Sequence, residues 1–214
     1  MTRILAFVIL IFLGGILPAA QEGVFQRLQN ENCELYALDQ EGIWHLTLLI
    51  RLCSQETDAL LKTSLVPQKP LSFFALKRDF EEREFTGGSV AVPLDEPVQR
   101  TLWRIFRALL QRRMRERLNT RAHDNASFAL LAAALANRVI YCGIAERGFY
   151  QPDFRIPRRQ FQKRQFPRIN DLLTSHPPVE SELLFRLYMV HANLLLDILE
   201  GTTRDLPGLL DVWW

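Results

Sequence analysis

The hydrophobic pattern of the chain changes near Asp95, and this change limits the fold more than any other feature of the sequence. Before it, short apolar stretches are separated by turn residues, and residues 43–52, 71–76 and 89–92 predict β-strands. A short helix over residues 54–65 is an alternative for part of this region. After Asp95, apolar residues recur every three or four positions over long stretches, which is the helical period. The sequence therefore predicts an α+β protein, mostly α, with a smaller β-containing N-terminal part.

The first predicted helix begins at Asp95, the expected N-cap, with Pro97 in its opening turn. One face carries its apolar residues, which are Val98, Leu102, Ile105, Phe106 and Leu109. Beyond Leu110 this stripe ends, because charged side chains surround the helix axis and leave only Met114 and Leu118 apolar. We expect this end of the helix to project into solvent or onto an acidic partner.

Two more long helices are predicted, over residues 125–145 and 179–200, with a short one over 169–173 between them. The helix over 179–200 is apolar around most of its circumference and should form the centre of the core. Its narrow polar strip consists of Glu182, Arg186, Asn193, Asp197 and Glu200.

The N-terminus has the pattern of a signal peptide. Arg3 supplies a positive charge, residues 4–17 form an apolar run, and cleavage is expected after Ala19 or Ala20. An uncleaved membrane anchor is the alternative, although the run is shorter than the about 20 residues of a membrane span. The predicted organisation is a signal peptide over 1–20, a β-containing region over 21–94 and a helical region over 95–214. The last two regions are expected to form one compact domain in an exported protein, either secreted or periplasmic.

Basic residues are concentrated in two segments, and 22 of the 26 are arginine. Residues 100–121 contain eight arginines and one glutamate, a net charge of +7, and residues 147–168 carry +6. The rest of a chain whose net charge is +2 therefore carries −11. This segregation predicts a polarised molecule with a basic surface, unless the arginines pair with acidic residues inside the fold.

The residues predicted to bind an acidic partner come from both segments, and the alternative is that they form internal ion pairs. They are Arg112, Arg113, Arg115, Arg117, Arg155, Arg158, Arg159 and Arg164. The expected partner is a protein or an anionic surface, either glycan or lipid. Nucleic acid is disfavoured for an exported protein, and membrane contact is expected only through an uncleaved N-terminus or a peripheral surface.

Cysteine and histidine spacing gives no metal site, and no cofactor is expected. In an oxidising compartment Cys33 and Cys53 are predicted to form a disulfide, whereas Cys142 falls on the apolar side of a helix as a buried thiol. His191 lies on the apolar side of the last long helix and is predicted to be a core histidine.

Glu146 is the one candidate for catalysis. It lies at a predicted helix C-terminus, where the helix dipole and burial both raise a carboxyl pKa, as a glycan-cleaving general acid requires. A lone helix-terminal glutamate resembles that of lytic transglycosylases, but Arg147 follows it where they have serine, and no Gly-Leu-Met-Gln segment comes after. An ion pair with a nearby arginine is the favoured interpretation. Asn125 begins a glycosylation sequon that matters only in a eukaryotic host.

These observations favour an exported, non-enzymatic protein that acts by binding, since no matched set of catalytic residues is found. A secreted helical signalling ligand and an envelope glycan-cleaving enzyme that uses Glu146 are the two alternatives.

Overall fold

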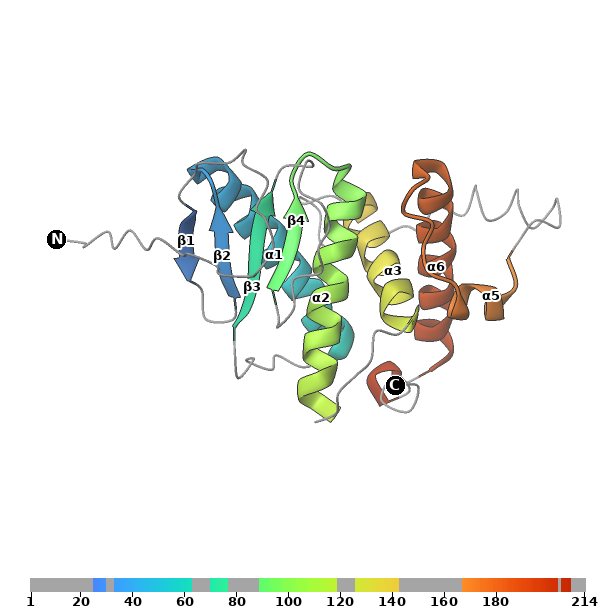
Figure 1. Cartoon of the computed structure of the whole chain (residues 1–214). Coiled ribbons are helices and arrows are strands. Elements are labelled where there is room, and N and C mark those ends of the chain that lie inside the picture. Colours follow the sequence, from blue (N-terminus) through green and yellow to red (C-terminus); the bar gives the residue numbers. More distant parts are fainter. Residues whose placement is uncertain are drawn as a thin grey trace, which may run out of the picture.

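A computed structural model describes residues 25–29, 33–62, 70–76, 89–118, 126–142, 167–203 and 205–208. A small sheet lies toward the N-terminal side, and a layer of helices extends from its edge (Figure 1). The predicted fold class is therefore confirmed. The expected signal peptide over residues 1–20 lies outside the described residues, and no described helix is long and apolar enough to cross a bilayer.

The sheet has four strands in the order β1-β2-β3-β4. They span Gln26–Gln29, Cys33–Ala37, Leu71–Leu76 and Ser89–Pro93. β1 pairs antiparallel with β2, while β2, β3 and β4 run parallel. The strands predicted over residues 71–76 and 89–92 are confirmed as β3 and β4.

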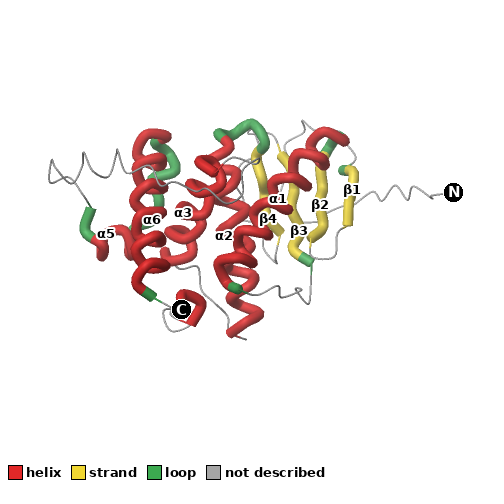
Figure 2. The backbone as a smooth tube through the Cα atoms, turned by 180° about the vertical axis from the view of Figure 1, so that it is seen from behind, coloured by secondary structure: helices red, strands yellow, loops and turns green. Residues whose placement is uncertain are grey.

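Helix α1 (Gln40–Leu61) connects the parallel strands β2 and β3 and covers one face of the sheet (Figures 1 and 2). The strand predicted over residues 43–52 is therefore wrong. The buried residues of α1 follow helical spacing, beginning with Ile43, Leu46 and Ile50. Trp44 and Leu48, at 58% and 44% exposure, lie among them and made the apolar run look continuous.

The α1 helix begins where the sequence provides a cap. Asp39 is in extended backbone geometry, and its carboxylate accepts a hydrogen bond of 2.6 Å from the backbone N–H of Gly42. In the same way Ser181 caps α6, where its hydroxyl accepts from the N–H of Leu184. These two caps set the direction in which each helix leaves its loop.

Three long helices form the rest of the core: α2 (Val98–Leu118), α3 (Ala126–Cys142) and α6 (Glu182–Thr202). α2 packs on α1 and β4, α3 packs between α2 and α6, and the short α5 (Ile169–Thr174) lies beside α3 and α6 (Figure 1). The short helix predicted over residues 169–173 is thereby confirmed.

The helix at the centre of the core is α3. The sequence had suggested the last long helix, α6, so this prediction was wrong. Residues 128–136 of α3 are all at most 1% exposed. α6 is buried on the face toward α3 but exposes Leu183, Leu184 and Ile198 by 68%, 52% and 51%. Small side chains explain the difference, because the alanines of α3 let helices approach it from two sides.

Candidate functional site

Two arginines at the end of α2, Arg112 and Arg113, do not project into solvent but form ion pairs within the fold, which corrects the first prediction and agrees with its stated alternative. Arg113 is 4% exposed, and its Nη2 lies 3.0 Å from Oδ1 of Asp58 on α1. Arg112 is half-buried, with Nε 2.6 Å from Oε1 of Glu116 one turn later. Arg115 is exposed, and the side chain of Arg117 lies outside the described residues. The cause is α1, since a helix there packs along α2 and brings a carboxylate to Arg113.

In the Arg113–Asp58 pair the arginine is buried and the carboxylate is partly exposed, and the arginine influences the thiol of Cys33. Burial raises the pKa of Asp58 above its usual value, although Arg113 opposes the shift. Burial also raises the pKa of Cys33 to about 11, again against the influence of Arg113. The Nη1 atom of Arg113 is buried without a hydrogen-bond partner in the described part of the chain. The thiol of Cys33 therefore stays protonated at neutral pH. We interpret the Arg113–Asp58 ion pair as a structural contact between α1 and α2.

A second set of arginines lies along the outer side of α2. Arg100, Arg104, Arg107 and Arg115 are separated by four, three and eight residues, so that a period of 3.6 residues brings them onto one ridge. Arg115 is exposed and the other three are partly buried, with the Nε atoms of Arg100 and Arg107 covered, whereas the apolar residues of α2 that face its neighbours are fully buried. We call these four residues the α2 ridge.

Two members of the α2 ridge have defined contacts. Arg104 donates from Nε and Nη2 to the two carboxylate oxygens of Glu96, both at 3.1 Å, in a bidentate pair. The guanidinium of Arg107 lies over the Trp103 ring, 5.4 Å from its centroid. Arg100 makes no ion pair with another residue in the described ranges. These contacts hold the side chains in place along the helix.

Several candidates from the sequence lie outside the described residues. They are Arg155, Arg158, Arg159, Arg164, the glutamate Glu146 and the sequon residue Asn125. The side chain of Cys142, at the end of α3, also falls outside them. Their predicted roles stay predictions.

The predicted Cys33–Cys53 disulfide is not present. Both thiols are free and buried, one on β2 and the other on α1. The prediction relied on the separation of about 20 residues along the chain, whereas a strand and a helix fill most of the segment between them and hold the two sulfur atoms apart. Burial raises the pKa of Cys53, which makes it an inert core thiol.

One of the described histidines lies in the core and two lie on the surface. His191 is 5% exposed in α6, and burial lowers its pKa, which confirms a core histidine. His45 and His176 are exposed. Within the described ranges no group of three His, Cys, Asp or Glu residues is arranged to hold a metal ion.

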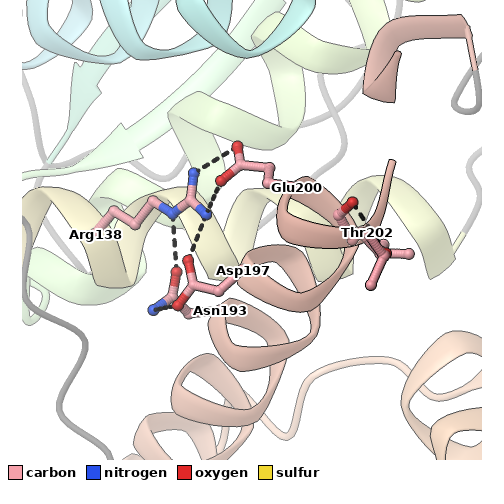
Figure 3. A network of polar contacts seen from close by, with 6 residues as sticks. Arg138, Asn193, Asp197, Glu200 and Thr202 are labelled. Atoms are coloured by element: carbon pink, nitrogen blue, oxygen red, sulfur yellow. Dashed lines mark hydrogen bonds and ion pairs between the residues drawn. The ribbon is translucent and has the colours of Figure 1, made fainter. Parts of the chain in front are cut away.

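Arg138 of α3 is the centre of a polar network that joins α3 to α6 (Figure 3). Its Nε donates to Asn193, its Nη1 to Glu200, and its Nη2 to both Asp197 and Glu200, over distances of 2.6–3.0 Å. Burial lowers the pKa of Arg138, but the two carboxylates outweigh it and raise the value. The acceptors are three of the five residues of the predicted polar strip, whereas no sequence pattern pointed to the arginine that binds them.

A second polar cluster lies on the sheet face opposite α1. Glu34 accepts hydrogen bonds from Arg27, Tyr36 and Ser72, which come from three neighbouring strands. Burial alone would raise the pKa of Glu34, but the donors Tyr36 and Arg27 outweigh it and lower the value. The Tyr36 ring stacks on Phe74 with centroids 4.5 Å apart. The carboxylate of Glu34 is paired within the cluster, so we interpret the cluster as a stabilising contact between strands rather than as a binding site.

A cleft of about 240 Å³ opens at the end of the sheet where β2 and β3 finish and α1 begins. This is the edge at which ligands of parallel α/β sheets commonly bind. Its polar lining is acidic, with Asp39, Glu41 and Asp95 beside His45. Asp39 is already engaged as the cap of α1.

Comparisons with protein-family models, with curated proteins and with solved structures gave no match.

Proposed function

We propose that this protein acts by binding an acidic macromolecule through the α2 ridge, and that it does so outside the cytoplasm. The observation that carries the proposal is the alignment of Arg100, Arg104, Arg107 and Arg115 on the outward side of one helix. The part of the proposal that concerns export rests on the N-terminal sequence pattern alone.

The geometry of the α2 ridge suits an extended anionic partner. From residue 100 to residue 115 the helix rises about 22 Å, at 1.5 Å per residue. Guanidinium groups bind carboxylate, sulfate or phosphate oxygens in bidentate pairs, which lysine cannot do as well. Glu96 pairs with one of the four arginines, Arg104.

The ridge also divides the arginine-rich segment by role. Arg113 faces inward to Asp58, so its replacement acts on folding rather than on a surface. Arg115, two residues later, faces outward. The binding residues proposed for α2 are therefore the four of the ridge, in place of the helix end as a whole.

The test is the triple variant Arg100→Gln, Arg107→Gln, Arg115→Gln, which keeps the Arg104–Glu96 pair. Binding is titrated against poly-glutamate, heparin and phosphatidylglycerol vesicles at two salt concentrations. We expect affinity for at least one polyanion to fall about tenfold or more and its salt dependence to flatten, because fewer charges are paired. Which polyanion responds identifies the partner as protein, glycan or lipid.

The matched control is Arg51→Gln, Lys62→Gln, Arg168→Gln, which removes the same charge from three exposed positions off the ridge. It should bind nearly as the unaltered protein does. Equal weakening by both triple variants would mean that net charge, and not the ridge, drives binding. Unchanged binding in the ridge variant would refute the proposal.

A further inference from the structure

A pocket of about 280 Å³ lies among the start of α2, the end of α3 and the first half of α6. α6 contributes Arg186, Leu187 and Val190, which share one helix face by their spacing. Ile140 and Asn137 come from α3, and Gln99 from α2. The volume is near the low end of small-molecule pockets, roughly 300–1,000 Å³.

Two polar side chains of this pocket, Asn137 and Arg186, form no hydrogen bond or ion pair with another residue that the structure describes. Asn137 is 6% exposed, and its carboxamide makes no hydrogen bond to another described residue. The amide atoms of Asn137 are not among the fully buried unsatisfied atoms, so the carboxamide can be reached from the pocket that it lines and is available to a ligand. Arg186 is exposed at the same pocket and makes no ion pair within the described ranges, not even with Glu182 one turn before it.

The chemistry of the lining selects one class of ligand. Leu187, Val190 and Ile140 present apolar surface, while Arg186, Asn137 and Gln99 can all donate hydrogen bonds. Of the pocket-lining residues only Arg186 is charged, so it matches a single negative charge, and a carboxylate accepts from several donors at once. We infer that this pocket binds a small amphiphilic monocarboxylate, with its apolar chain between α3 and α6 and its carboxylate at Arg186 and Asn137.

This site is independent of the α2 ridge. Gln99 is the contribution of α2 to the pocket, and none of the four ridge arginines lines it. The ridge triple variant should therefore bind such a carboxylate normally, and a failure of the ridge proposal leaves this inference untouched.

The experiment is calorimetric titration of the full chain with octanoate, and with octan-1-ol as the neutral molecule of the same length. We expect saturable octanoate binding and at least tenfold weaker binding of octan-1-ol. Arg186→Gln should weaken octanoate binding about tenfold, the loss of one charge-assisted hydrogen bond, without altering that of octan-1-ol. Arg51→Gln, an exposed arginine on α1, is the matched control and should change neither.

Leu187→Trp should abolish binding of both molecules by filling the pocket. A thermal melt of Leu187→Trp shows whether this variant folds. If it does not fold, the surface variant Arg186→Gln still decides the test. The inference is overturned if octanoate does not bind saturably, if octan-1-ol binds equally well, or if Arg186→Gln binds octanoate as the unaltered protein does.

Discussion

Two helix interfaces of this molecule each hold an arginine, and they accommodate it differently. Between α3 and α6, all three nitrogens of Arg138 donate to acceptors on α6 (Figure 3). Between α1 and α2, Arg113 has one carboxylate partner, and its Nη1 is left without a hydrogen bond in the described part of the chain. We therefore expect Arg138 to stabilise the α3–α6 interface. Arg113 is a buried charge whose single ion pair should contribute little net stability to the α1–α2 interface.

The largest effect should follow from the loss of Arg138. Arg138→Met leaves Asp197 and Glu200 beside each other without a cation, and we expect the free energy of unfolding to fall by about 3 kcal/mol. This is the low end for buried pairs, because the Glu200 side chain is 39% exposed. Urea denaturation measures it, with Arg168→Met at an exposed site as control. A fall in the free energy of unfolding of less than about 1 kcal/mol would mean that the network contributes no more than an exposed ion pair.

The α1–α2 pair should respond differently to single and double replacement. Asp58→Leu alone leaves Arg113 as an uncompensated buried charge and should destabilise the protein by about 2 kcal/mol. Adding Arg113→Met removes that charge and should restore most of the loss. If the double variant is instead as unstable as the sum of the two single variants, Arg113 and Asp58 do not act as a pair.

The smallest effects concern pH, and they should have opposite signs at two carboxylates. The pKa of Glu34 is lowered in the folded protein, so its contribution is present above the usual value of 4.5 and is lost as pH falls through the folded pKa. We expect Glu34→Gln to cost about 1 kcal/mol at neutral pH and progressively less in acid, as followed by urea denaturation at several pH values.

For Asp58 the raised pKa reverses the direction. Ionised Asp58 is disfavoured in the folded state at neutral pH, and this penalty is relieved as pH falls through the folded pKa toward the usual value of 3.8. The stability of the unaltered protein relative to Asp58→Asn should therefore increase as pH falls. The same sign for Glu34→Gln and Asp58→Asn would contradict the different environments assigned to them.

The sequence predicted the long helices α2, α3 and α6 but misjudged α1, which carries one of the two polar interfaces, and missed the strands β1 and β2. α1 looked like a strand because Trp44 and Leu48, which are exposed, fill the gaps between its buried positions. Without α1, no element placed a particular carboxylate near Arg113, so the arginine was predicted to lie on the surface, with an internal ion pair as the alternative. Local hydrophobic pattern does not reveal the tertiary partner that decides whether a charge is buried.

In the α3–α6 network, helical spacing revealed the acceptors on α6 but not the arginine on α3 that donates to them. The polar strip with Asn193, Asp197 and Glu200 was visible by helical spacing, but Arg138 is 55 to 62 residues away in the chain. The α2 ridge, in contrast, depends only on spacing within one helix, and its four arginines were all in a segment already recognised as basic. The pocket at Arg186 needs three helices and had no sequence signal.

The central claim is that the outward arginines of α2 bind and the inward one does not, and arginine labelling tests it most directly. The protein is treated with phenylglyoxal, with and without the polyanion that it binds best, and modified residues are located by mass spectrometry. We predict that the polyanion protects Arg100, Arg107 and Arg115, that Arg51 and Arg168 react equally in both samples, and that buried Arg113 reacts in neither. Equal labelling of the three ridge arginines with and without a bound polyanion would contradict the account.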